Sequence, residues 1–188
     1  MTTEPTRLTA PPGLALRPET DDDVPFLAEL YASTRREEVA QLPWSDEEKE
    51  AFLRWQFNNQ RAHYRQYYPE CQFLVVERVA DDGGGAEPVG RLYVDRWPSE
   101  VRLVDIALLP AHRGAGIGGA LLCELLAEGD ARGLPVTIHV EYSNPALRLY
   151  RRLGFRHVDS NGIYYLMRWE PGSSGPVPAA EAPEDPPA

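Results

Sequence analysis

The stretch 112–133, "HRGAGIGGALLCELLAEGDARG", decides how this sequence folds, because glycines stand directly before an apolar segment of helical composition. Two spacings overlap in it, G-x-G-x-x-G over 114–119 and R-x-x-G-x-G over 113–118. Glycine lets the backbone approach a ligand closely, and free N–H groups at a helix N-terminus attract phosphate. The stretch therefore predicts a phosphate-binding turn that leads into a helix.

The segments on either side predict alternating strands and helices. Apolar runs at 101–110 and 136–141 are typical of strands, and Gly133 with Pro135 ends the helix between them. Ser45, followed three residues later by Glu48, resembles a capping box that opens a long helix. Over the whole chain the predicted order is β-α-α-β-β-β-α-β-α-β-β, an α/β (α+β) domain whose mixed sheet carries helices on both faces.

Length and composition indicate one folded domain at 13–170, between a flexible arm at 1–12 and a disordered, acidic, proline-rich tail at 171–188. The net charge of −10 argues against a nucleic-acid or anionic-membrane binder. Neither a signal region nor a membrane-length apolar run is apparent, so we expect a cytoplasmic protein, monomeric or homodimeric. Cys123 lies in an apolar helical stretch, where we expect a buried free thiol and no metal cluster.

The glycine-rich turn has three other interpretations besides an acyl-CoA site. A nucleoside-triphosphate loop needs Lys-Ser/Thr after its last glycine, and Ala120-Leu121 stand there instead. A dinucleotide turn is supported by Glu141 at the place of a ribose ligand, but residues 110–113 separate the strand from the first glycine. A turn that binds nothing remains possible, although helical glycines destabilise a helix by about 0.5–1 kcal/mol each.

Taken together, "VRLVDIALLPAHRGAGIGGALLCELL" (101–126) and "NPALRLYRRLGF" (144–155) resemble the Gcn5-related N-acetyltransferase (GNAT) superfamily. The first segment is similar to its acetyl-CoA loop with the preceding strand and following helix, and the second to its N-x-A-x-x-L-Y-x-x-L-G-F segment. The resemblance implies a mostly antiparallel sheet in which strands 101–109 and 136–141 form a central parallel pair that splays apart.

The same resemblance implies how acetyl-CoA is held. The pantetheine arm would pair with backbone groups of the strand, and the pyrophosphate would bind amides of the loop, with Asn144 bonding the arm. Asn144 has an alternative role as a helix N-cap. The implied contacts are Ile106, Ala107 and Leu108 on the strand, Arg113, Gly114, Ala115, Gly116, Ile117 and Gly118 in the loop, and Asn144 and Tyr150 beyond it.

Tyr150 occupies the family's general-acid position, from which it would protonate the departing CoA sulfur; its alternative is packing on the inner face of the helix. The family has no fixed general base, and three residues are candidates. His139 and Glu141 share one face of their strand by alternation, and neutral His139 needs no pKa shift to act near pH 7. Asp105 points opposite to Val104 and Ile106 unless a bulge intervenes, so we rank it third.

Gln56, Gln60 and His63 recur on one face of the long helix at 46–67 and could line an acceptor pocket, or could be solvated. We therefore expect an acetyl-CoA-dependent N-acetyltransferase acting on a primary amine of a small molecule or peptide, without a metal. The alternative is a catalytically silent acyl-CoA-binding regulatory module on the same fold.

Overall fold

The computed structural model describes residues 8–80 and 85–173 of the chain. Seven strands form one sheet in the order β1-β2-β3-β4-β5-β7-β6, in which every neighbouring pair is antiparallel except the parallel pair β4–β5. The strands are β1 (Leu14–Pro18), β2 (Gln72–Val79), β3 (Ala86–Arg96), β4 (Val101–Leu108), β5 (Val136–Glu141), β6 (Arg156–Asn161) and β7 (Tyr164–Trp169). The expected fold class, including its one central parallel pair, is confirmed.

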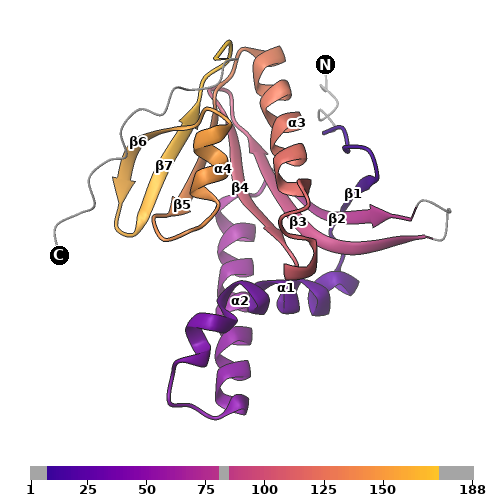
Figure 1. Cartoon of the computed structure of the whole chain (residues 1–188), viewed down its shortest axis with the longest axis vertical. Helices are drawn as coiled ribbons and strands as arrows, with labels where there is room; N and C mark the ends of the chain where they lie inside the picture. The colour runs from indigo at the N-terminus through magenta and orange to yellow at the C-terminus, as the bar shows by residue number, and fades with distance from the viewer. Residues whose placement is uncertain (1–7, 81–84, 174–188) are drawn as a thin grey trace.

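Four α-helices cover this sheet, two on each face (Figure 1). They are α1 (Val24–Ala40), α2 (Asp46–Tyr67), α3 (Ile117–Arg132) and α4 (Leu147–Arg152), with short 3-10 turns η1 (Asp21–Asp23) and η2 (Pro110–His112) before α1 and α3. The helix expected from Asn144 starts at Leu147, because residues 142–146 form turns instead.

The face under α3 and α4 is apolar. Val101 and Leu103 of β4 pack with Val136 and Ile138 of β5 against the leucines of α3, and Leu8 of the expected N-terminal arm joins this core. Burial of such side chains contributes about 1.5–3 kcal/mol each. This layer therefore holds the parallel pair together at its start.

Local sequence signals mark the start of α2 and the end of α3. The Ser45 hydroxyl accepts a hydrogen bond from the Glu48 N–H at 3.2 Å, and the Glu48 carboxylate accepts one from the Ser45 N–H at 2.8 Å, so the expected capping box is present. Gly133 ends α3 in the left-handed conformation at φ 64°. Cys123 is a free thiol, as expected, but it is exposed; Leu121, Leu122 and the next turn's leucines occupy the buried side of α3 instead.

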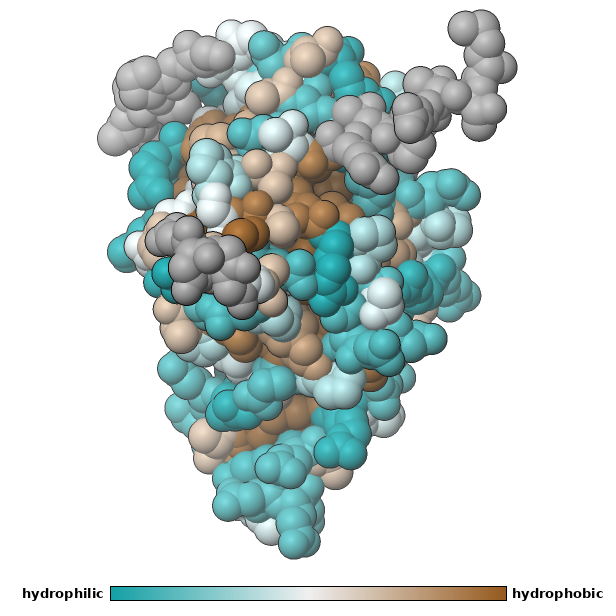
Figure 2. All heavy atoms as spheres, turned by 90° about the vertical axis from the view of Figure 1, so that its right-hand side faces the viewer, coloured by the Kyte–Doolittle hydropathy of each residue, from teal (hydrophilic) through white to brown (hydrophobic). Residues whose placement is uncertain are grey.

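The surface matches this layering. Figure 2 shows polar side chains predominating toward the lower, tapered end of the molecule, and apolar surface higher up. In the described ranges, no helix combines the length and apolarity that crossing a membrane requires. Most of the tail expected at 171–188 and of the arm expected at 1–12 lies outside the described residues.

Candidate active site

A β-bulge in β4 turns Asp105 toward α2. Tyr93 of β3 lies opposite Asp105, whereas Val94 lies opposite Leu103, so Val104 is an extra residue in the ladder. Opposed residues share a face, and the Tyr93 ring packs edge-on against Tyr64 of α2 with centroids 5.9 Å apart. Simple alternation would have put Asp105 in the apolar core beside Leu103, and the bulge prevents this.

Directly after the bulge, β4 and β5 separate. Their pairing covers only Val101–Leu103 against Val136–Ile138, although β4 continues to Leu108 and β5 to Glu141. On its other side β4 stays paired with β3 as far as Leu108. Within the described residues, the edge of β4 that carries Ile106 and Ala107 thus has no strand beside it, as the resemblance implies for a pantetheine-binding edge.

Asp105 is in ionic contact with Arg91 of β3. Arg91 Nη2 lies 2.5 Å from Asp105 Oδ2, and Arg91 is only 4% exposed. The two groups are not aligned for a hydrogen bond, and in the described part of the chain Arg91 Nε and Asp105 Oδ2 have no hydrogen-bond partner. Burial alone would lower the pKa of Arg91, but the neighbouring Asp105 carboxylate outweighs this effect and the guanidinium stays charged.

Tyr150 of α4 is buried on the α3–α4 side, 3% exposed, and its ring lies edge-on to Phe155 at 5.6 Å. Burial raises the pKa of the Tyr150 phenol, and the charge of Asp105 raises it further. The same charge contributes to the raised pKa values of Tyr64 and Tyr93, for which burial is the larger cause. The charge of Asp105 therefore acts on tyrosines from α2, β3 and α4, and Tyr150 holds its proton at neutral pH.

The glycine-rich turn lies between β4 and α3. Gly114 and Gly116 have positive φ values of 75° and 84°, a conformation that other residues rarely adopt. Among the described residues, no acceptor is hydrogen-bonded to the N–H groups of Gly114, Ala115 or Gly116. The first N–H groups of α3, from Ile117 onward, also have no partner within the helix. This cluster of free N–H groups fits a pyrophosphate.

The Arg113 side chain turns back from this loop toward the sheet. Its Nε donates to the Leu108 carbonyl at 2.8 Å, and its Nη2 donates to Ser33 Oγ of α1 at 3.3 Å. Arg113 thus links the loop to the end of β4 and to α1. The Leu108 carbonyl, expected to face the pantetheine arm, already accepts a hydrogen bond.

His139 of β5 lies beside a buried arginine. Arg102 Nη1 is 2.8 Å from His139 Nδ1, and because a guanidinium only donates, Nδ1 must accept and Nε2 must carry the ring proton. Burial lowers the pKa of His139, and the charge of Arg102 lowers it further. Glu100 accepts hydrogen bonds from Arg102 and from Thr137 Oγ1, which fixes Arg102 in this position.

Glu141, at the end of β5, is bound to α1. Arg35 of α1 forms an ion pair with it, including a hydrogen bond from Nη1 to Oε2 of 3.2 Å, and Arg35 also contacts Glu38 at 3.2 Å. Tyr164 of β7 lies nearby: burial raises the pKa of its phenol, and Glu141 raises it further. The ion pair connects α1 to the open end of the splayed strands.

The remaining residues predicted for the site are Gln56, Gln60 and His63 of α2, and Asn144 before α4. Gln60 accepts a hydrogen bond from Arg91 Nη2 at 2.8 Å and so faces the sheet, whereas Gln56 accepts one from the Tyr31 hydroxyl at 3.3 Å and so faces α1. His63 is exposed and stacks on Tyr67 with centroids 4.5 Å apart. Asn144 Oδ1 accepts from the Ala146 N–H at 2.8 Å, an arrangement typical of a side chain that supports a helix start.

Reasoning from the sequence missed the residues that connect these groups, above all Arg91, Tyr64 and Arg35. One signal was available: Arg91 interrupts the apolar run "VGRLYV" of a central strand, where a charge needs a partner. The partners themselves could not be identified because they come from other elements. Within residues 8–80 and 85–173, no cluster of three or more metal-binding side chains occurs.

Comparisons with known proteins agree with this geometry. The family described as "Acetyltransferase (GNAT) family" matches residues 27–155. The chain is 30% identical over 178 residues to a mycothiol acetyltransferase of Thermobifida fusca, covering 81% of this chain and 50% of that protein. It is 44% identical over 69 residues to the N-alpha-acetyltransferase RimI of Mycobacterium tuberculosis, covering 36% and 42% of the two chains. The chain thus spans half or less of these curated relatives.

Solved structures share the fold at lower identity. A PaiA N-acetyltransferase of Thermoplasma acidophilum, solved with coenzyme A, matches 84% of this chain and 98% of its own at 19% identity and a TM-score of 0.60. The ribosomal-protein-S18-alanine N-acetyltransferase of Escherichia coli covers 86% and 96% at 20% identity, with a TM-score of 0.53. From the family match over 27–155 and this common fold, the chain belongs to the GNAT acetyltransferase family.

Proposed function

We propose that this protein is an N-acetyltransferase that moves an acetyl group from acetyl-CoA to a primary amine of a small molecule or peptide. One observation carries the proposal: after the bulge, β4 loses its pairing with β5, and the charge of Asp105 on one face of that opening raises the pKa of the buried Tyr150 phenol on the other. A proton acceptor and a proton donor on the two sides of an opening are what amine acetylation needs.

Acetyl-CoA fits the features that flank this opening. The free N–H groups of 114–118 suit the pyrophosphate, and the unpaired edge at Ile106 and Ala107 suits the amide groups of the pantetheine arm. A backbone N–H at that edge would stabilise the thioester oxygen as it gains charge. We expect Asn144 to support the turn before α4, and its only contact with acetyl-CoA to be with the pantetheine arm.

Asp105 is our candidate for the general base. An amine with a pKa of about 10.4 is protonated at pH 7 and must lose a proton before it attacks the thioester carbon. That first proton would pass to solvent, which leaves a neutral amine with a free lone pair. As the C–N bond forms, the Asp105 carboxylate would accept a second N–H proton, and as the C–S bond breaks, Tyr150 would donate its proton to the sulfur. The products are then a neutral amide and CoA thiol, and solvent returns the proton from Asp105 to the Tyr150 phenolate.

The other two candidates are engaged elsewhere. The only lone pair of neutral His139 is directed at Arg102, which leaves none to take a proton from the acceptor. Glu141 is neutralised by Arg35, and we propose that this pair lines the acceptor entrance together with Tyr31. The acceptor would approach from the α1–α2 side, where Gln56 and Gln60 lie.

The names of two relatives mention a small molecule, mycothiol, and an alanine of a ribosomal protein. The chain covers half or less of those proteins, and we propose a primary amine as its class of acceptor. A screen of amines and peptide N-termini should reveal CoA release from acetyl-CoA, and Tyr150→Phe should reduce it.

Two other outcomes would contradict the proposal. Acetyl-CoA binding in calorimetry without turnover of any acceptor, and equal binding by Tyr150→Phe, would favour a silent acyl-CoA-binding module. Thermal stabilisation by a nicotinamide dinucleotide but not by acetyl-CoA would support a dinucleotide site instead.

A further inference from the structure

The contact between Arg91 and Asp105 is poorly explained by stability. Arg91 Nε is buried and has no hydrogen-bond partner in the described part of the chain, which costs about 1–3 kcal/mol. Asp105 Oδ2 is compensated there only by its ionic contact with Arg91 Nη2. Since replacing a buried ion pair by apolar side chains is often neutral or stabilising, the pair points to a role in the reaction.

Arg91 is fixed from two directions. Its Nη2 group lies 2.5 Å from Asp105 Oδ2 across the β3–β4 ladder and donates to Gln60 Oε1 of α2 at 2.8 Å. The guanidinium is planar and stays charged, so these contacts determine where its positive charge lies relative to Asp105. Gln60, which we expected to touch the acceptor, instead contacts the arginine.

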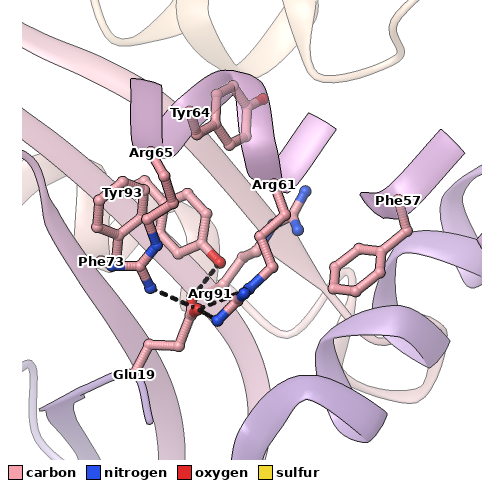
Figure 3. A pocket seen from close by; sticks show the side chains of 8 residues that line it. All are labelled: Glu19, Phe57, Arg61, Tyr64, Arg65, Phe73, Arg91 and Tyr93. Carbon is pink, nitrogen blue, oxygen red and sulfur yellow. Dashed lines mark hydrogen bonds and ion pairs between the residues drawn. The ribbon is translucent and has the colours of Figure 1, made fainter. Parts of the chain in front are cut away.

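The next turn of α2 fixes Gln60. Figure 3 shows the Glu19 carboxylate bonded by Arg61, Arg65 and Tyr93, with Arg91 nearby. Arg65 Nη2 donates to Glu19 at 2.7 Å, and the Tyr93 hydroxyl donates at 2.5 Å. Because Arg61 follows Gln60 directly, this network anchors the part of α2 that presents Gln60 to Arg91.

We propose that Arg91, held by Gln60, is a positioning residue for Asp105: it fixes the orientation of the carboxylate at the splay so that it faces the acceptor amine. This inference rests on the proposed function, since Asp105 matters only if it receives the acceptor. The ion pair with Arg91 is the observation that carries it.

The test compares Arg91→Met with Arg91→Lys and with Arg96→Met. Arg96 lies on the same strand and pairs with Glu128 of α3, away from Asp105, which makes it a matched control. For Arg91→Met we expect kcat to fall by about 100-fold, within the range of general-base effects, with acetyl-CoA affinity within about twofold of wild type. Arg91→Lys should restore part of kcat, and Arg96→Met should leave it unchanged.

A double-mutant cycle separates positioning from a structural effect. In an Asp105→Asn background, Arg91→Met should cause little further loss of kcat, because both changes remove the same step. Gln60→Leu should lower kcat by about three- to tenfold on the same reasoning. Additive losses in the cycle, or wild-type kcat in either Arg91→Met or Asp105→Asn, would overturn the positioning role.

One readout does not depend on turnover, so failure of the proposed function can be recognised separately. At neutral pH the carbon-13 chemical shift of the Asp105 carboxyl should change in Arg91→Met, because the carboxylate loses the contact that orients it, and it should not change in Arg96→Met. An unchanged chemical shift in Arg91→Met would overturn the inference even if no acceptor were found. A changed chemical shift without any acetyl transfer would refute only the proposed enzyme activity.

Discussion

The two faces of the sheet differ sharply although the same strands build both. Toward α3 and α4, Val101, Leu103 and Ile138 present an unbroken apolar layer. Toward α1 and α2, alternate residues of the same strands are polar, and the half-buried or buried groups include Arg91, Tyr93, Arg102, Thr137 and Glu141. Their partners are other polar side chains, such as Glu19 for Tyr93 and Glu100 for both Arg102 and Thr137, and burying such pairs is costly for stability alone. The first face holds the sheet together, and the second carries the groups that we assign to the reaction.

The largest effect should come from changing the polar face at the bulge. Asp105→Asn keeps the volume of the side chain but removes the charge, so we expect kcat to fall by about 10²–10⁴-fold if Asp105 is the base. The thermal midpoint should fall as well, because the substitution leaves the buried Arg91 guanidinium without its counter-charge. Steady-state kinetics and a melting curve on the same preparation check both parts.

One variant of His139 and one variant of Glu141 provide the controls for this prediction. His139→Gln and Glu141→Gln should each retain more activity than Asp105→Asn. If either of them were the more damaging change, the assignment of the base to Asp105 would be wrong.

A matched change on the apolar face should have the opposite pattern. Leu103 is 1% exposed, pairs with the last bonded residue of β5 and packs in the α3–α4 core. Leu103→Ala should lower the free energy of unfolding by about 2–5 kcal/mol, because it removes buried carbon and leaves a cavity. Urea denaturation measures this loss, and kcat of the fraction that stays folded should remain within a few fold. A large loss of kcat without destabilisation would contradict the division between the faces.

This contrast also explains how much could be predicted from the sequence. Local patterns predicted the order of the strands and α-helices that the described residues form, although α4 starts at Leu147 rather than Asn144 and the 3-10 turns η1 and η2 were not predicted. The resemblance predicted the parallel pair. The bulge at Val104 could not be predicted, since a run such as "VRLVDIAL" permits either register and the choice depends on tertiary packing. The extra residue Val104 determines which face Asp105 occupies. Strict alternation along the strand, which ignores this bulge, puts Asp105 last among the three candidate bases.

A smaller effect, with opposite signs for stability and binding, is expected at the start of α3. A Cβ added to Gly118 would come no closer than 3.9 Å to Leu108 and Leu149, so the protein itself has room for alanine. Gly118→Ala should therefore raise the free energy of unfolding by about 0.5–1 kcal/mol, since glycine weakens a helix. It should also weaken acetyl-CoA binding in calorimetry, because the methyl group would stand where the pyrophosphate approaches the backbone.

Gly119→Ala is the control for that prediction. Its added Cβ would lie 3.8 Å from Leu149, an ordinary contact, and Gly119 is outside the loop residues assigned to the pyrophosphate. We expect the same gain in stability with unchanged affinity. Stabilisation without any loss of affinity in Gly118→Ala would show that the helix start does not contact the cofactor closely.

The smallest effect should be a pH dependence that comes from His139. Its pKa is lowered in the folded protein, by burial first and by Arg102 second, relative to about 6.5 in the unfolded chain. As the pH falls through about 6.5, the unfolded chain takes up the proton first, so the stability present at higher pH is progressively lost. His139→Gln can still accept from Arg102 but cannot titrate, and its unfolding free energy should therefore fall less than that of wild type between about pH 7.5 and 5.5.

His63→Gln, at an exposed histidine of α2, controls for the general loss of an imidazole. An equal fall in wild type and His139→Gln would mean that the Arg102 contact does not hold the ring neutral, and the argument against His139 as the base would lose its support.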